Sequence, residues 1–399
     1  GNNSYSGTTA INAGTVQLGG NNRLADSSNV SIGASGTLDL NGFSEKIGAL
    51  TAAGGATLDF GSASGANTFI IGTYNAPASG VLVVNNWETG LDKLATTTAS
   101  QNVSTVYLSG YGVAQEAASV SAMGGTYGNA YLLTPVAVIG VEWDGSSSAN
   151  WNTNNNWTPA AKPTSTQIAV FDSRGTGRPN VNLNGNNTVE GVRFGTGASV
   201  SYNITGTNTL TLTGTVPYIQ QLSSNNQTLS PSTLALSNST VVDITGAGNL
   251  TIGSTITGAV NLIKDGTGTG KLILTGNNSG LTGGVFVNNG IAQAANTNAL
   301  GTDATTVADG ATLELSGGIS PANAISVTGT GVGGAGALHN VNGSNTLSGT
   351  ITEGGATSIA SDSGSTLSLN GDITGINANT SFAGAGNINP RTCIKVGAG

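Results

Sequence analysis

One short motif recurs along the chain and limits the folds available to it. It consists of Gly, a small residue, Thr-Leu, any residue, an apolar residue and then Asn, Ser or Gly. Its copies span residues 36–42, 55–61, 310–317 and 364–371. Within each copy the apolar residues alternate with Thr, Asp, Glu or Ser, which is the pattern of a short strand with one buried face. Asn and Gly at the ends tolerate the left-handed backbone of tight turns, so the motif predicts strands joined by corners.

The spacing of the apolar positions predicts how these strands are arranged. Val16, Leu38 and Leu58 are 22 and 20 residues apart. Two further series have similar spacing: Leu250, Leu272, Ile291 and Leu313, and Leu347 with Leu367. A strand that recurs at this interval is typical of a parallel β-helix, in which coils stack about 4.8 Å apart. We therefore expect an all-β solenoid of about 20–22 residues per coil; separate β-sandwiches are the alternative.

The composition excludes several classes of protein. Lys and Arg number 11 against 19 Asp and Glu, which gives a net charge of −8, so nucleic acid is not an expected partner. One Cys and one His cannot form an internal disulfide, a thiolate site or a His cluster for a metal. No apolar run reaches the length of about 18 residues that a transmembrane helix needs. We expect no cofactor and no transmembrane segment.

Residues 63–141 depart from the repeat. The motif disappears there, longer strands are expected at 81–87 and 131–139, and the stretch 113–120 has weak helical character. We expect a compact β-sandwich-like domain inserted into the β-helix. The expected domains are coils over 1–62, the inserted domain over 63–141, a Trp-containing start of a second array over 142–200, and further coils over 201–399.

Three of the four Trp residues lie close together in the sequence, at Trp143, Trp151 and Trp157. Large aromatic side chains are useful where a solenoid starts, because small side chains cannot seal its core. We expect the three to pack the first coil or a domain junction. Stacking on sugar rings is the alternative.

Candidate catalytic groups are few and dispersed. Asp39 and Asp59 are expected one coil apart on an outward face, about 5 Å from each other, but no sequence feature marks an apolar environment for either carboxyl. His339 has no Ser or Cys nucleophile in a suitable context. Cys393 lies near the end of the chain, where a lone thiol could join subunits. We expect no catalytic and no metal-binding residues, and a polysaccharide-processing enzyme is the alternative.

Two segments resemble a known family. They resemble the autotransporter-associated β-strand repeat, also called the passenger-associated transport repeat. One is the segment 270–290, which contains Gly276-Asn277-Asn278-Ser279, and the other is the segment 1–19, which begins with Gly1-Asn2-Asn3-Ser4. The Trp-containing segment 143–157 is similar to the start of such proteins in Gram-negative bacteria, and residues 68–138 resemble their closing domain. The resemblance implies a right-handed β-helix that is secreted or exposed at the bacterial cell surface, and it carries no catalytic residues.

The order of these segments is rotated relative to the family, since the closing domain comes early. The end of the chain resembles the first part of a repeat, and the beginning of the chain resembles the second part of the same repeat. We therefore expect copies to continue head to tail. Uncapped β-helix ends template the addition of strands, and a heterologous contact that does not close makes a filament. The expected interface residues are Gly1, Asn2, Asn3, Tyr5, Ile394, Val396 and Gly399.

The expected function follows from this assembly. The sequence predicts an extracellular structural protein, not an enzyme, whose partners are copies of itself in a filament, sheath or surface layer. The alternative is a surface adhesin or autotransporter passenger that uses the β-helix as a stalk and contacts cell-surface glycans.

Overall fold

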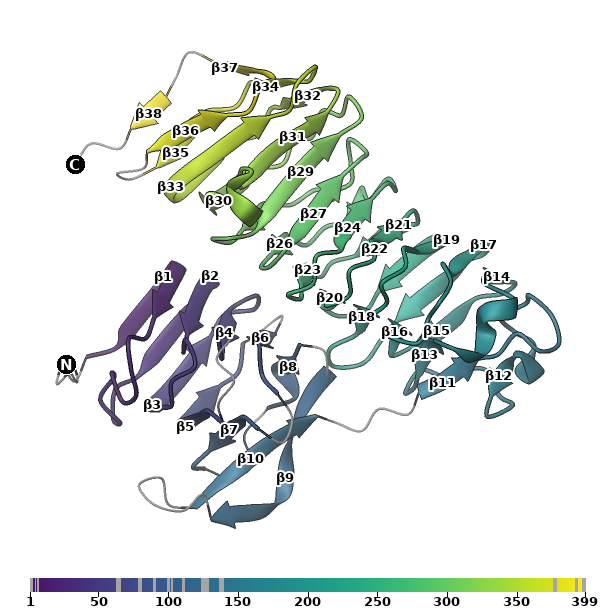
Figure 1. The fold of residues 1–399 in the computed structure, drawn as a ribbon, viewed down its shortest axis with the longest axis horizontal. Helices are drawn as coiled ribbons and strands as arrows, with labels where there is room; N and C mark the ends of the chain where they lie inside the picture. The colour runs from purple at the N-terminus through teal and green to yellow at the C-terminus, as the bar shows by residue number, and fades with distance from the viewer. Residues whose placement is uncertain are drawn as a thin grey trace. The chain divides into compact units, whose positions relative to one another are not determined.

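The chain folds into two compact units, residues 1–137 and 138–399, in a computed structural model (Figure 1). The structure describes residues 3, 5, 7–61, 66–77, 81–88, 91–98, 101, 103–109, 112–122, 129–135, 140–375, 379–391 and 394–396. The fold is all-β and forms a β-solenoid of about 15 turns with parallel strands. This confirms the solenoid that the repeat spacing predicts.

Unit 1 is a stack of parallel strands with two inward-facing sheets. One sheet face runs through β1, β2, β3, β5 and β7, and a second through β2, β4, β6 and β8. Val16 lies opposite Leu38 and Leu38 opposite Leu58, as their spacing predicts. The elements are β1 (Thr9–Gln17), β2 (Val30–Asp39), β3 (Glu45–Ala52), β4 (Thr57–Asp59), β5 (Thr68–Asn75), β6 (Leu82–Asn85), β7 (Lys93–Thr96), η1 (Val103–Thr105), β8 (Val106–Leu108), β9 (Gly112–Ala122) and β10 (Asn129–Pro135).

The inserted β-sandwich-like domain expected over 63–141 is not confirmed. β5 and β7 continue the parallel pairing of β3, and β6 and β8 continue that of β4, so these strands add coils to the solenoid. The stretch 113–120, expected to be weakly helical, lies in β9. A run such as 81–84 is apolar throughout, and such a run fits a sandwich strand and a solenoid strand equally well. The sequence pattern therefore could not separate the two folds.

Unit 2 is a longer solenoid with three faces, which we call A, B and C. Face A contains β11 (Gly140–Trp143), β13 (Ile168–Phe171), β16 (Gly191–Phe194), β18 (Tyr218–Gln221), β20 (Thr240–Ile244), β23 (Leu262–Asp265), β26 (Val285–Val287), β28 (Thr305–Val307), β30 (Ile325–Gly329), the start of β33 (Ile351–Ser361), β35 (Ile373–Gly375) and β38 (Ile394–Val396). Face B contains β14 (Asn180–Asn182), the starts of β17 (Asn203–Leu212) and β19 (Gln227–Leu236), β21 (Leu250–Ile252), β24 (Lys271–Leu274), β27 (Ile291–Ala294), β29 (Thr312–Ser316), β31 (Leu338–Asn342), the end of β33 and β36 (Thr380–Ala383).

The third face and the irregular elements complete unit 2. Face C contains β15 (Asn187–Val189), the ends of β17 and β19, β22 (Thr255–Gly258), β25 (Gly280–Leu281), β32 (Ser344–Leu347), β34 (Thr366–Leu369) and β37 (Asn387–Pro390). β12 (Trp157–Thr158) pairs with β11, and the short 3-10 turns are η3 (Asn154–Asn156), η4 (Arg174–Gly177) and η5 (Val332–Gly334).

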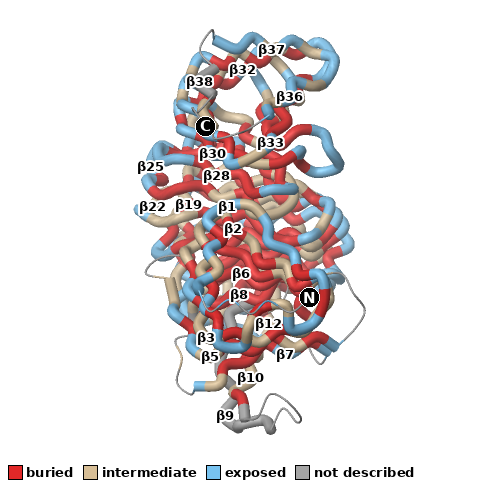
Figure 2. Tube along the Cα trace, turned by 90° about the vertical axis from the view of Figure 1, so that its left-hand side faces the viewer, coloured by how far each residue is buried: buried red, intermediate tan, exposed pale blue. Residues whose placement is uncertain are grey.

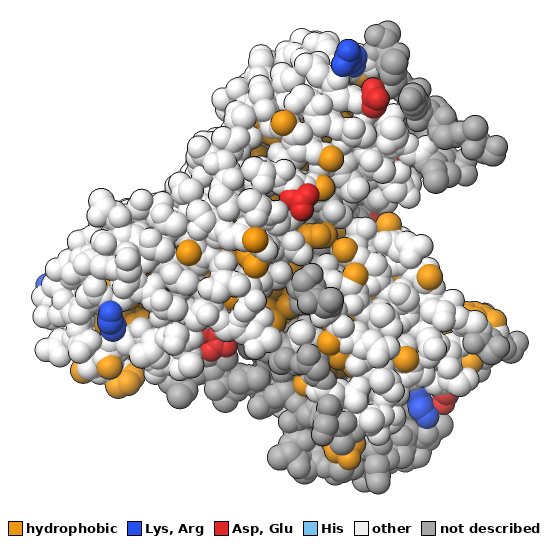
Figure 3. All heavy atoms as spheres, turned by 180° about the vertical axis from the view of Figure 1, so that it is seen from behind, with side chains coloured by type: hydrophobic (Ala, Val, Ile, Leu, Met, Phe, Trp, Pro, Cys, Tyr) orange, Lys and Arg blue, Asp and Glu red, His pale blue; other side chains and the backbone are white. Residues whose placement is uncertain are grey.

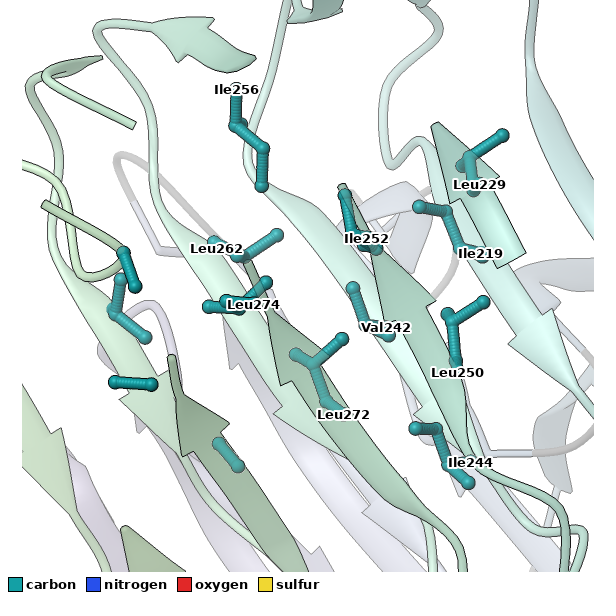
Figure 4. Packing of buried hydrophobic residues seen from close by; sticks show 14 of the residues in the cluster. Ile219, Leu229, Val242, Ile244, Leu250, Ile252, Ile256, Leu262, Leu272 and Leu274 are labelled. Atoms are coloured by element: carbon teal, nitrogen blue, oxygen red, sulfur yellow. The ribbon is translucent and has the colours of Figure 1, made fainter. Parts of the chain in front are cut away.

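The core of unit 2 consists of inward side chains stacked in register from coil to coil. Row A, on face A, contains Val141, Ala169, Val192, Ile219, Val242, Lys264, Val287, Val307, Val327 and Glu353. Row B, on face B, contains Gln227, Leu250, Leu272, Ala292, Leu313, Leu338, Ile359 and Phe382. Figure 4 shows this stacking around Leu250 and Leu272, and Figure 2 shows buried residues along the inside of the coils.

Three of the expected pairings are wrong by one or two residues. Leu272 lies opposite Ala292, and Ile291 lies opposite Lys271 and Thr312 on the outward side. A shift of one residue exchanges the two faces of a strand; two adjacent apolar residues left that choice open in the sequence. Leu347 lies opposite Leu369, while Leu367 lies opposite Asn345.

Asparagine side chains hold the corners where successive coils turn. Buried Asn278 accepts a hydrogen bond from the Ile256 amide at Oδ1 (2.8 Å) and donates one from Nδ2 to the Ala299 carbonyl (2.7 Å). One side chain thus serves backbone groups of the coils before and after its own. This bonding supplies partners for corner groups that the strand ladders leave unpaired.

Candidate assembly interface

The first coil of unit 2 is closed by the tryptophan cluster. Trp143, Trp151 and Trp157 are all buried, and the rings of Trp143 and Trp157 meet edge to face with centroids 5.1 Å apart. Trp157 Nε1 donates to the Trp151 carbonyl at 2.7 Å. Phe171 of the next coil packs against all three rings. This confirms that the Trp residues pack the first coil, and their burial excludes stacking on a sugar from solvent.

Strand direction also changes at this end. β12 runs antiparallel to β11, with Trp143 opposite Trp157. In unit 1 the corresponding reversal occurs at the other end of the stack, where β9 is antiparallel to β8 and β10 is antiparallel to β7 and β9. A reversed strand ends the parallel ladder, so each unit has one end at which a further parallel coil cannot simply be added.

The opposite end of unit 1 is open. Among the described residues β1 pairs with β2 alone, so its other edge carries no strand (Figure 1). Val16 belongs to an inward row, since it lies opposite buried Leu38, yet it is 36% exposed. Of the expected interface residues, Asn3 donates its amide to the Arg23 carbonyl at 3.0 Å, and Tyr5 is exposed with its hydroxyl 2.5 Å from Thr9 Oγ1. Gly1 and Asn2 lie outside the described residues.

The corresponding open end of unit 2 is formed by β36, β37 and β38. In the described part of the chain each has a parallel neighbour on one side, namely β33, β34 and β35. Phe382 is the last member of row B and is 42% exposed, whereas Ile359 beneath it is buried. Ile394 and Val396 lie in β38, in register with Ile373 and Gly375. Gly399 lies outside the described residues.

The open ends thus present apolar residues that the sequence did not single out. Val16 and Phe382 each occupy a position that is buried in every neighbouring described coil of its row. The sequence carried part of this signal, because both residues continue the alternation of their strands, and no copy of the motif precedes Val16 or follows Phe382. Figure 3 shows one face on which charged side chains are few, so charge does not dominate that surface.

The remaining candidate groups are engaged in structural contacts. Asp39 and Asp59 are neighbours in register, as expected; Asp39 accepts from Gln17 Nε2 at 2.7 Å and Asp59 from Asn86 Nδ2 at 2.7 Å. Burial raises the pKa of Asp59, against the hydrogen bonds from Gly61 and Asn86. The expected surface histidine, His339, pairs with Asp362 at 2.9 Å. Cys393 lies outside the described residues.

Two charged residues point into the core, which the sequence did not predict. Lys264 is fully buried in row A, where its ammonium donates to the carbonyls of Asp265 (2.8 Å) and Asn289 (3.0 Å). Burial lowers its pKa to about 8, although Asp265 and Asp243 act in the opposite direction. Glu353 occupies the same row near the open end. Alternation along 262–265 did not fix which residues face inward, because both Leu262 and Ile263 are apolar.

Within the described ranges, no group of three or more His, Cys, Asp or Glu side chains could hold a metal ion. Over the same residues, no helix is both long and apolar enough to cross a bilayer.

No family model, curated protein or solved structure matches the chain. The resemblance to the autotransporter-associated repeat therefore stays a prediction, and the interface is argued from geometry.

Proposed function

We propose that the protein is an extracellular structural protein whose copies join head to tail through the open solenoid ends. The observation that carries this proposal is the pair of exposed inward residues, Val16 on β1 and Phe382 on β36. Among the described residues, no strand pairs with the outer edge of β1 or with the outer edges of β36, β37 and β38. The strands at one open end can therefore pair with the strands at the other open end of a second copy. Such a contact can repeat from copy to copy without closing into a ring.

Backbone hydrogen bonds and apolar burial would both stabilise the joint. Edge strands present unpaired N–H and C=O groups that template another strand. Covering Phe382 and Val16 would add roughly 1–3 kcal/mol for each side chain. A filament, sheath or surface layer is the product of such a joint, and its function is mechanical.

An adhesin remains the alternative proposal, and no observation favours it over the structural protein. The Trp residues that could have stacked on glycans are buried in the first coil of unit 2. The extracellular or bacterial surface location is supported by the family resemblance alone.

Negative-stain electron microscopy and sedimentation of the full chain test the proposal. We expect filaments for the wild type and dispersed particles for Phe382→Asp, because a carboxylate would be buried in the joint. Val332→Asp is the matched control: Val332 is 37% exposed but lies in η5, which precedes β31, two coils before β36, so this variant should assemble like the wild type. A wild type that stays monomeric at high concentration, or a Phe382→Asp variant that still polymerises, would overturn the proposal.

A further inference from the structure

Glu353 lies inside the solenoid, directly before the open end of unit 2. In row A it follows Val327 and precedes Gly375, with backbone pairing on both sides. The residue is only 5% exposed. The carboxyl of Glu353 thus occupies a position of row A that is apolar in nearly all of the other coils.

The carboxyl has a single hydrogen-bonding partner among the described residues. Oε1 and Oε2 each lie 2.8 Å from Thr380 Oγ1. A hydroxyl carries one hydrogen, so it can satisfy one oxygen of an ionised carboxylate at a time. A protonated carboxyl can donate its own hydrogen to Thr380 Oγ1. The geometry thus favours the neutral form.

Among the side chains that the structure describes, no cation forms an ion pair with Glu353. The elements packed against Glu353 contribute Val327 from β30, Gly375 from β35 and Thr380 from β36. The titratable groups with described side chains on neighbouring elements lie elsewhere: His339 on β31 pairs with Asp362, exposed Arg391 after β37 donates to the Asn370 carbonyl, and Asp372 precedes β35. The backbone of Lys395 on β38 is in register with that of Thr374. Burial raises the pKa of Glu353, and the hydrogen bond from Thr380 opposes this in part.

Thr380 links this carboxyl to the assembly surface. It is the first residue of β36, the last strand of face B, and Phe382 lies two residues further along the same strand. Ionisation of Glu353 would place a charge beside Thr380. The strand that must receive the next copy is therefore held both by its ladder to the end of β33 and by a hydrogen bond to this carboxyl.

We propose that protonation of Glu353 regulates the open end of unit 2, an inference that rests on the proposed function. With the carboxyl neutral, β36 is held in place and the end accepts another copy. With the carboxyl ionised, β36 loosens and assembly slows. Acidic conditions thus promote filament growth and neutral conditions restrain it.

The test compares filament formation by the full chain at a pH near the ordinary glutamate pKa of 4.5 and at neutral pH, because burial raises the pKa of Glu353 above that ordinary value. We expect wild-type assembly to fall about tenfold or more at the higher pH. Glu353→Gln keeps a neutral side chain of the same shape and should assemble almost equally at both values. Glu190→Gln is the matched control, since burial also raises the pKa of Glu190 but this residue lies far along the chain, beside β15 and β16. It should keep the wild-type response.

Hydrogen exchange of the Thr380–Ala383 amides separates this inference from the proposed function. We expect faster exchange at the higher pH in the wild type, beyond the intrinsic effect of pH, and no such excess in Glu353→Gln. If no variant forms filaments at either pH, the proposed function fails, and the exchange data still decide whether Glu353 anchors β36. Filaments whose pH response is the same in wild type and Glu353→Gln, or exchange that is unchanged by the substitution, would overturn the regulatory role.

Discussion

The two ends of unit 2 are built from similar coils but finish differently. At the start, three buried Trp rings and the antiparallel pair β11 and β12 close the core. At the other end, β36, β37 and β38 remain parallel and Phe382 is partly exposed. A parallel solenoid has no intrinsic stopping point, because each coil offers an edge and a core to the next. A stop needs a seal for the core and a change of strand direction, and the second end has neither among its described residues.

The largest difference between these ends should appear on truncation of an aromatic side chain. We expect Trp157→Ala to lower the free energy of unfolding by about 3–5 kcal/mol, because it leaves a cavity among fully buried rings. Phe382→Ala should cost about 1 kcal/mol or less, since much of that ring is already in water. Denaturant unfolding of the full-length variants, followed by circular dichroism, measures both. Equal losses would mean that the exposed end is packed as firmly as the sealed one.

The sequence predicted the features that depend on period and composition. Repetition of Leu, Val and Ile at coil spacing fixed the parallel solenoid, and the Trp cluster fixed one sealed end. It did not determine which residue of a strand faces the core where two apolar residues are adjacent, as at Ile291 and Ala292, because either side chain can face inward. It also suggested a separate domain over 63–141. A strand that is apolar throughout does not indicate whether its neighbours run parallel or antiparallel to it, so the sequence could not distinguish a sandwich from further coils.

The open ends could be predicted only in part. Interface positions at both ends of the chain were expected, but Val16 and Phe382 were not among them, since their exposure depends on which coil lies at the end of the stack. Glu353 could not be found in the sequence, because a charged residue in an alternating strand is expected to face solvent. Its inward position follows from the register with Val327 and Gly375.

Lys264 and Glu353 extend the comparison into the core, since they occupy the same inward row. Lys264 has paired coils on both sides, and its ammonium donates to the carbonyls of Asp265 and Asn289. In the part of the chain that the structure describes, Glu353 has one hydrogen-bonding partner, a hydroxyl that belongs to an edge strand. A buried charge far from an end should therefore affect overall stability, whereas one near the open end should affect assembly.

The next largest effect should be a rise in stability between pH 8 and pH 10 that depends on Lys264. Its folded pKa of about 8 lies below the ordinary value of 10.5. The unfolded chain thus binds more protons in this window, and stability increases with pH, by about 2 kcal/mol. Lys264→Met removes the titration and should remove the rise; unfolding midpoints at the two pH values measure it.

The window must end near pH 10 because buried tyrosines act in the opposite sense. Burial raises the pKa of Tyr202, with Asp172 and Glu142 adding to the effect. Above the ordinary tyrosine pKa the unfolded chain loses this proton first, so stability falls as pH rises. If the stability of the wild type and of Lys264→Met changes equally between pH 8 and pH 10, Lys264 is not the source of the rise in stability.

The smallest effect should come from Asp144, at the outer surface of the sealed end. Burial alone would raise its pKa, but hydrogen bonds from Thr158 and Ser146 and the nearby Arg174 lower it. Its stabilisation should be present above the ordinary aspartate pKa and lost as pH falls through the folded value, the reverse of Glu353. Because Asp144 is largely solvated, Asp144→Asn should cost less than about 1 kcal/mol at neutral pH and nothing in strong acid. Unfolding midpoints of the two proteins at both pH values would show this convergence. A gap that persists in acid would mean that Asp144 supports the seal through shape and not through its charge.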